Sequence, residues 1–433
     1  MADAYGHFVR TGSFPVNTLK SYQELNYNQF NVLDGQWSYE NVRPEECNAL
    51  DAADNYLWDK WQFGDAPGDC SGSTTTTPAG TTTISTTSST TQESSTTTQA
   101  GDLSSSMSCD GTNCVVSFSD GGQFNCLQSD DYVECRGIPY VEAPIGDKRW
   151  RATSMITSYA GQSLDNTQYK PMCPGDSWND NGQFSEDCLY VNIHFDKSKF
   201  DAGELMPMMY FIHGGGFSGG SNRGLMIDSE SKILLLKTSR NFKCDFQGNY
   251  NHLVLEQGIM VVDIAYRLGI YGFLWSPTAE STNPQEPFQG NWGLIDQTQA
   301  LTWGSIFAKH FAGDASQATL NGCSAGSESI WWHLVTPQSW PYFNQAITVG
   351  VGLNAQFNVA MATQKWNNYM TATGCSNYAC LRTKTNQELS QAMNQARFEH
   401  PIKPILVSSK TSPVVDGVML LGKVLNFCVS QFL

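Results

Sequence analysis

The chain has 433 residues, with 41 acidic and 25 basic side chains and a formal net charge of −16. This length allows two or three domains, and the ordinary apolar content allows a large core. The negative charge argues against nucleic acid or an anionic membrane as the main partner. No apolar run of about 18 residues occurs, so we expect no transmembrane segment.

A segment of unusual composition, residues 71–106, consists mostly of Ser and Thr. It cannot bury enough apolar area to offset the entropy lost on ordering, so we expect a flexible linker. An O-glycosylated stalk is the alternative. Both interpretations place a domain boundary in this segment. No Asn-x-Ser/Thr sequon occurs, so N-glycosylation is not expected.

Beyond the linker, short β-rich apolar runs alternate with longer helix-like segments. Expected strands are Met208–Ile212, Ile259–Ala265, Ala318–Asn321 and Ala346–Val349, and expected helices are Leu294–Ala308 and Ala325–Val335. Strands separated by helices imply right-handed crossovers and a mostly parallel sheet.

A possible nucleophile lies between the third of these strands and the helix that follows it. Gly322-Cys323-Ser324-Ala325-Gly326 fits the G-x-S-x-G pattern, in which a sharp turn exposes the serine hydroxyl. The positive N-terminus of the helix would face a developing oxyanion. The pattern alone is weak, because it also occurs around Ser218. Polar residues follow Ser218 instead of a helix, so Ser324 is the preferred candidate.

A glycine-rich loop, His213-Gly214-Gly215-Gly216-Phe217, follows the first expected strand. Three glycines allow backbone N–H groups to approach an oxyanion without obstruction by side chains. We therefore interpret it as an oxyanion loop, although a plain glycine-rich turn is the alternative. His213 itself is expected to be structural rather than a base.

Further motifs occur in a fixed order between Val133 and Gly417. They are Gly137–Tyr140, Pro144–Gly146, Arg149–Arg151, Ser185–Asn192, Tyr266–Gly269, Gly272–Leu274, Gly290–Gln297, Phe311–Asp314 and Pro413–Gly417. With the glycine loop and the Ser324 motif, this series resembles the type-B carboxylesterase family, which includes cholinesterases and related lipases.

The resemblance implies an α/β-hydrolase fold, with a mostly parallel twisted sheet flanked by helices and a truncated C-terminal part. It implies Ser324 as the nucleophile of a serine esterase. The N–H groups of Gly215, Gly216 and Ala325 would form the oxyanion hole. The expected partner is a small-molecule ester, and neither a cofactor nor a metal ion is expected.

Thirteen cysteines, several in close pairs such as Cys109/Cys114 and Cys126/Cys135, favour disulfides because Cys-x-x-Cys metal spacing is absent. We therefore expect a secreted or extracellular protein, although the N-terminus has no signal-peptide features. The resemblance implies two particular disulfides, Cys173–Cys188 and Cys375–Cys380. It also implies two structural ion pairs, Arg149 with Glu186 and Arg267 with Asp296.

The sequence departs from the family pattern at two places near these motifs. Cys323 stands where many members have Glu, which makes cation-selective substrates less expected, and we interpret it as a small buried thiol. Asn222–Gln247 is longer than the corresponding family loop. It is either a surface insertion or an untranslated segment read through by mistake.

The triad partners of Ser324 are missing from their family positions, which lie beyond Pro413–Gly417. Only His333 and His400 follow Ser324 in the chain. His333 lies on the helix after the nucleophile and is expected to be packed or on the surface. His400 precedes the Pro413–Gly417 motif and so does not match the family base.

The N-terminal residues resemble the end of the same family rather than its beginning. Tyr5–Gly12, Tyr27–Asp34 and Arg43–Cys47 carry this weaker similarity. It predicts a tail of a preceding esterase domain at 1–62, a linker at 63–106 and the main esterase domain at 107–433. The expected function is ester hydrolysis, impaired by the missing triad partners. A non-catalytic adhesion or structural relative is the alternative.

Overall fold

The chain divides into two units, residues 1–35 together with 103–433, and residues 36–102. All residues described by the computed structural model belong to the first unit. They are residues 10, 30–33 (backbone only), 105–176, 182–223, 250–278, 289–349, 357–396, 411–417 and 419–420.

Within these described residues, eleven strands form one sheet and two short strands form a second. The strands of the large sheet follow the spatial order β1-β11-β10-β8-β9-β7-β5-β4-β3-β2, with β6 beside β4. Their bounds are β1 Phe30–Leu33, β2 Ser105–Cys109, β3 Asn113–Phe118, β4 Gln123–Ser129, β5 Tyr132–Pro139, β6 Ser163–Asp165, β7 Tyr190–Asp196, β8 Met206–Ile212, β9 Met260–Ile264, β10 Gly313–Cys323 and β11 Gln345–Val349. The small sheet pairs β12 Phe357–Asn358 with β13 Val414–Val415.

The large sheet is parallel where the candidate nucleophile lies and antiparallel on the N-terminal side. Strands β9, β8, β10 and β11 are mutually parallel, as the alternating strands and helices predict. Strands β2 to β5 and β7 form an antiparallel meander that joins β9. This mixed character was not evident from the sequence, because the meander strands contain few long apolar runs.

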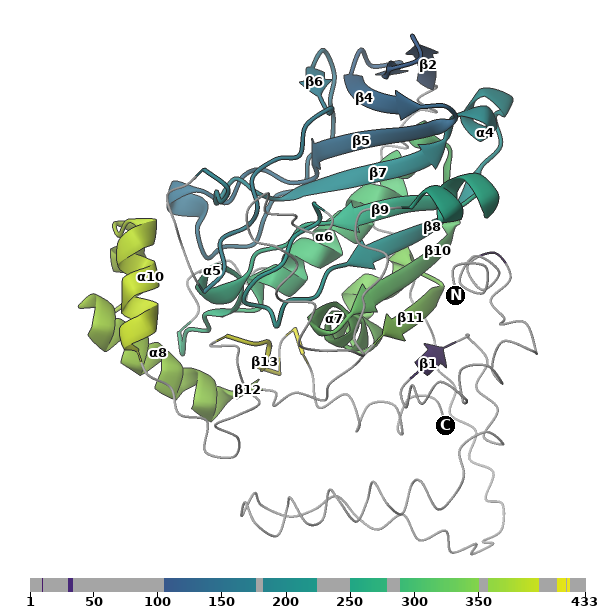
Figure 1. Ribbon diagram of the computed structural model, residues 1–433. Coiled ribbons are helices and arrows are strands. Elements are labelled where there is room, and N and C mark those ends of the chain that lie inside the picture. Colours follow the sequence, from purple (N-terminus) through teal and green to yellow (C-terminus); the bar gives the residue numbers. More distant parts are fainter. Residues whose placement is uncertain are drawn as a thin grey trace, which may run out of the picture. The chain divides into compact units, whose positions relative to one another are not determined.

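Helices cover the parallel part of the sheet (Figure 1). Helices α6 and α7 contact its strands, whereas α8 and α10 pack against each other beside it (Figure 1). The helices are α4 Lys197–Ala202, α5 Gly269–Phe273, α6 Trp292–Phe307, α7 Ala325–Leu334, α8 Val359–Thr373, α9 Tyr378–Arg382 and α10 Asn386–Gln395, with short 3-10 or π turns at Gly146–Lys148, His252–Glu256, Ala308–Phe311 and Pro337–Tyr342. No helix among the described residues has the length and apolar content needed to cross a membrane.

Strand β8 shows why the centre of the sheet is buried on both faces. Its side chains alternate between the faces, as strand geometry requires. Met208 and Tyr210 enter the large core, whereas Met209 enters a smaller cluster on the other face. A strand buried on both faces reads as a continuous apolar run, which is why this strand was evident in the sequence.

The predicted elements around the candidate nucleophile agree closely with the observed ones. The expected helix Ala325–Val335 is α7 and the expected helix Leu294–Ala308 is α6. The expected strand Ala318–Asn321 is the last part of the longer β10, whose register with β8 shifts between Asp314 and Ala318. The sheet and helices therefore place the glycine loop and Ser324 at the same end of the parallel strands.

Candidate active site

Ser324 occupies a strained turn between β10 and α7. Its backbone has φ 55° and ψ −119°, a region that non-glycine residues rarely adopt. Such strain persists only where the surrounding structure enforces it, and it is commonly found at functional sites. The serine is partly exposed, whereas the first six residues of α7 are buried. The turn thus leaves Ser324 partly exposed at the start of a buried helix.

Two glycines allow the strand and the helix to crowd together at this turn. A Cβ atom on Gly322 would lie 2.5 Å from the carbonyl carbon of Gly326. A Cβ atom on Gly326 would overlap the carbonyl oxygen of Ile212, at the end of β8. The G-x-S-x-G spacing is therefore required by close backbone packing, as the sequence pattern suggests.

The glycine loop after β8 lies against the Ser324 turn. A Cβ atom on Gly214 would be 2.6 Å from the Cys323 carbonyl oxygen and 3.1 Å from Cβ of Ser324. Gly215 and Gly216 have φ of 121° and 62°. Positive φ values and close backbone contacts explain why glycine is needed at these positions.

The amide hydrogens of Gly215, Gly216 and Ala325 have no hydrogen-bond partner among the described residues. Ala325 is the first residue of α7, and the first N–H groups of a helix have no intrahelical partner. The loop and the helix N-terminus thus bring these donors to the neighbourhood of the serine.

His213 supports the glycine loop and is not placed to act as a base. Its Nδ1 lies 2.8 Å from the carbonyl oxygen of Gly214, and its ring stacks on Tyr266 with centroids 4.4 Å apart. The Tyr266 hydroxyl donates a hydrogen bond to the His213 carbonyl oxygen. Burial lowers the pKa of His213 to about 4. The expected structural role agrees with this arrangement.

His333 is packed inside the protein, as expected. Its Nδ1 lies 2.8 Å from Oγ of Ser339, and its Nε2 lies 2.9 Å from Oε1 of Gln297. Burial lowers its pKa to about 3, so it stays neutral at physiological pH. Because both ring nitrogens have protein partners, His333 has no free nitrogen with which to take a proton from Ser324.

Two residues in the first turn of α7 were missed by the sequence analysis. The Ser327 hydroxyl donates to the carbonyl oxygens of Gly322 and Val349, at 2.5 and 2.9 Å, and so ties the turn to β11. Glu328 lies one turn after Ser324 and is only 9% exposed. Burial raises the pKa of Glu328 to about 8. Nothing in the sequence distinguishes this glutamate from a surface one, except its position after the motif.

The raised pKa of Glu328 predicts a pH-dependent stability. Between its unperturbed pKa of 4.5 and about 8, the folded chain holds a proton that the unfolded chain has released. The free energy of unfolding should therefore fall as pH rises through this range. Glu328→Gln should flatten that fall, as measured by urea unfolding from pH 5 to pH 8. Equal slopes in both proteins would contradict an effect of Glu328.

Cys323 corrects one expectation, because it is not a free thiol. It is buried, and its sulfur forms a disulfide. The second cysteine lies outside the described residues, since all other described cysteines pair among themselves. No sequence pattern predicts this bond, because no other cysteine is close to Cys323 in the chain. The cysteines outside the described residues are Cys47, Cys70, Cys244 and Cys428.

The identity of this second cysteine tests the hypothesis of a tandem protein. If residues 1–62 are the tail of a preceding domain, Cys47 should pair with a cysteine of that domain and not with Cys323. We expect peptide mapping of the unreduced chain to join Cys323 to Cys70, Cys244 or Cys428. A cross-linked peptide containing both Cys47 and Cys323 would overturn the tandem interpretation.

The structure contains both disulfides and both ion pairs that the resemblance implies. Cys173–Cys188 and Cys375–Cys380 are bonded. The pairs Cys109–Cys114 and Cys126–Cys135, whose members lie close together in the sequence, are bonded as well. Arg149 Nη2 lies 2.5 Å from Glu186 Oε1, and Arg267 Nε lies 2.7 Å from Asp296 Oδ2.

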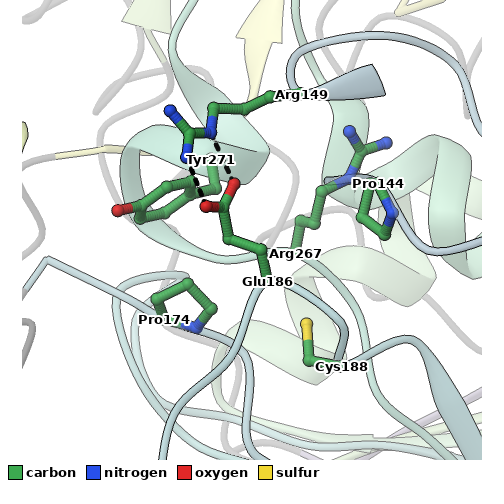
Figure 2. A pocket seen from close by; sticks show the side chains of 7 residues that line it. All are labelled: Pro144, Arg149, Pro174, Glu186, Cys188, Arg267 and Tyr271. Carbon is green, nitrogen blue, oxygen red and sulfur yellow. Dashed lines mark hydrogen bonds and ion pairs between the residues drawn. The ribbon is translucent and has the colours of Figure 1, made fainter. Parts of the chain in front are cut away.

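Figure 2 shows the Arg149–Glu186 pair beside a small cavity, with Arg267 and Tyr271 nearby. Arg149 also donates to the carbonyl oxygen of Lys384, just before α10. The pairs therefore join segments that are distant in the sequence.

Several sequence-based expectations fall outside the described residues. They concern the tail and linker residues near His7, Cys47 and 63–104, most of the long loop Asn222–Gln247, and His400. Those interpretations remain predictions.

The comparisons with known proteins agree with this arrangement. Mouse (Mus musculus) cholinesterase is 32% identical over 306 residues, covering 66% of this chain and 45% of that protein. Liver carboxylesterase 1 of Oryctolagus cuniculus is 29% identical over 310 residues, covering 66% of this chain and 49% of the relative. A solved structure titled thermophilic pNB esterase superposes with a TM-score of 0.54 at 25% identity, covering 70% of this chain and 58% of its own.

The chain thus spans about half the length of the relatives that it matches. The sequence pattern of the carboxylesterase family matches residues 121–427, which include the glycine loop, the Ser324 turn and both ion pairs. Since this match covers more than half of the chain, the chain belongs to the carboxylesterase family, and its fold is that of the α/β-hydrolases.

Proposed function

We propose that this chain is the nucleophile-bearing part of a carboxylic ester hydrolase. The observation that carries the proposal is the strained Ser324 turn, set beside the N–H groups of Gly215, Gly216 and Ala325, which have no acceptor in the part of the chain that the structure describes. Donors preorganised around a developing oxyanion are a large source of rate enhancement in acyl transfer. The substrate class is a small-molecule ester of undetermined identity. The Cys323 disulfide, where many relatives carry a glutamate, argues against selectivity for cationic esters.

The proposed reaction is a serine acyl transfer. The Ser324 Oγ attacks the ester carbonyl carbon, and its proton passes to a base. The C–O bond to the alcohol breaks, and the alcohol leaves after taking up a proton. Water then attacks the acyl-enzyme, which releases the acid and restores the serine.

We also propose that hydrolysis is impaired in this chain, because none of the described residues is placed to act as the base for Ser324. His213 and His333 are buried, and their pKa values are lowered to about 4 and about 3. His400 lies outside the described residues, and its sequence position does not match the family base. Without a base, a serine hydroxyl remains a weak nucleophile.

The test is acylation of Ser324 by a p-nitrophenyl ester, with added imidazole as the missing base. We expect mass spectrometry to find the acyl group on the peptide containing Ser324, in an amount that rises with imidazole. Ser324→Ala should remove this modification. Ser218→Ala, which alters the other motif match, is the matched control and should leave it unchanged.

A non-catalytic adhesion or structural relative would give a different result. In that case Ser324 would be acylated no faster than an ordinary surface serine, with or without imidazole. That outcome would contradict the proposed esterase chemistry.

We further propose that the protein works outside the reducing cytosol. The supporting observation is the set of four disulfides that join described cysteines. Disulfides of this kind persist in secreted and extracellular proteins and are rare in the cytosol.

A further inference from the structure

A cluster of buried titratable side chains lies on three adjacent strands, away from the candidate active site. Glu134 on β5, His194 on β7 and Asp263 on β9 are 8%, 3% and 3% exposed. The register of the sheet places Glu134 directly opposite His194. Buried charges are costly unless they are paired, so the balance of charge within this cluster matters.

Glu134 already has a permanent cation as its partner. Arg136 Nη2 donates to Glu134 Oε2 at 2.7 Å, and the Tyr169 hydroxyl donates to Oε1 at 2.7 Å. Burial opposes the ionisation of Glu134, but the hydrogen bond from Arg136 and the charge of His194 leave its pKa lowered. The charge of Arg136 is therefore already paired with that of Glu134.

Asp263 has no such permanent cation beside it among the described residues. Its Oδ1 accepts a hydrogen bond of 2.6 Å from the Tyr250 hydroxyl, which carries no charge. Burial raises the pKa of Asp263, which shows that its charge is poorly compensated. The basic group facing its other oxygen is His194, with Nε2 3.6 Å from Oδ2.

His194 lies close to Asp263 without forming a hydrogen bond to it. The Tyr132 hydroxyl lies 2.7 Å from Nδ1, so that side of the ring is held. The Tyr250 ring packs against it, with centroids 4.8 Å apart. Nε2 is buried and has no hydrogen-bond partner among the described residues. Its distance of 3.6 Å from Asp263 is longer than a hydrogen bond.

We propose that His194 and Asp263 form a proton-dependent latch between β7 and β9, closed when the imidazole is protonated and open when it is neutral. Protonation gives Nε2 a positive charge facing a buried carboxylate, and charge-assisted hydrogen bonds are shorter and stronger than neutral ones. The neighbouring titratable groups are Tyr132, Glu134 and Arg136 on β5, Tyr169, and Tyr250 before β9.

A double-mutant cycle at two pH values tests the latch on the full 433-residue chain. The variants are His194→Gln, Asp263→Asn and the double variant, each unfolded with urea at pH 5.5 and pH 8. We expect the coupling between the two sites to reach about tenfold in the folding equilibrium constant at pH 5.5, the scale of a hydrogen bond to a charged group. At pH 8 the coupling should be much smaller. The same coupling at both pH values, or none at either, would overturn the proposal.

Tyr250→Phe is the matched control. It removes the other hydrogen bond to Asp263 without removing a group that titrates in this range, so its effect should be similar at pH 5.5 and pH 8. Should a variant fail to fold, hydrogen exchange on the unaltered chain gives a second measurement. After correction for intrinsic exchange, the protection gained at pH 5.5 relative to pH 8 should be about tenfold larger for amides in the β7–β9 ladder than for amides in the β10–β11 ladder, which is not adjacent to β7. Equal gains in the two ladders would also overturn the latch.

Discussion

Purified residues 1–433 are expected to hydrolyse a short-chain aryl ester hardly faster than their Ser324→Ala variant. In a serine hydrolase, loss of the catalytic base lowers turnover by roughly 10⁶, and a rate of about 10³–10⁴ over water remains from binding and the oxyanion hole. The histidine nearest to Ser324 in the chain, His333, has both ring nitrogens occupied and a pKa of about 3. Steady-state hydrolysis by the two proteins, compared over a range of ester concentrations, measures the difference.

Ser218→Ala is the control for non-specific effects of removing a serine, because Ser218 lies in the turn of the glycine loop. Labelling with a reactive phosphonate should also be slow in all three proteins. Fast, saturable hydrolysis that disappears in Ser324→Ala would show this expectation to be wrong. It would mean that a base reaches Ser324 from a part of the chain that the structure does not describe.

Removing the carboxylate of Asp296 is expected to destabilise the chain by about 3–5 kcal/mol, the cost of leaving a buried charge unpaired. Asp296 is fully buried and accepts hydrogen bonds from Nε, Nη2 and the backbone N–H of Arg267. Asp296→Asn keeps the shape of the side chain but leaves the arginine without its countercharge. The free energy of unfolding in urea at pH 7 gives the result.

The exposed pair Lys148–Glu142 provides the comparison. Its side chains are 56% and 55% exposed, and such pairs contribute about 0–1 kcal/mol. Glu142→Gln should therefore change the free energy of unfolding far less than Asp296→Asn does. If the two substitutions had equal effects, the Arg267–Asp296 pair would not have the structural role that its burial suggests.

The parts of the site that the sequence predicted are those fixed by local chemistry. The turn at Ser324 needs glycine on both sides because the backbones of β10, α7 and β8 almost touch. That requirement produces the short G-x-S-x-G motif, which can be recognised in the sequence. The buried strand β8 likewise appears as an apolar run, since both of its faces lie in a core.

The features that the sequence did not reveal depend on contacts between distant segments. His194 and Asp263 are separated by 69 positions in the chain and come together only through the register of β7 and β9. The burial of Glu328 depends on what packs against α7, and the bond at Cys323 depends on a cysteine elsewhere in the chain. The residue types alone do not show which distant segments of the chain come into contact.

The disulfides of the described domain also determine how it would respond to a pulling force. A disulfide carries tension across the loop that it closes, so the residues inside that loop cannot extend. The closed loops have sequence separations of 5, 9, 15 and 5 residues. At about 3.5 Å of contour per residue, they withhold roughly 100 Å of extensible length. The first cross-links the last residue of β2 to β3, and the second cross-links β4 to β5. A pulling force applied through the residues before Ser105 could therefore separate β2 from β3 only as far as Cys109.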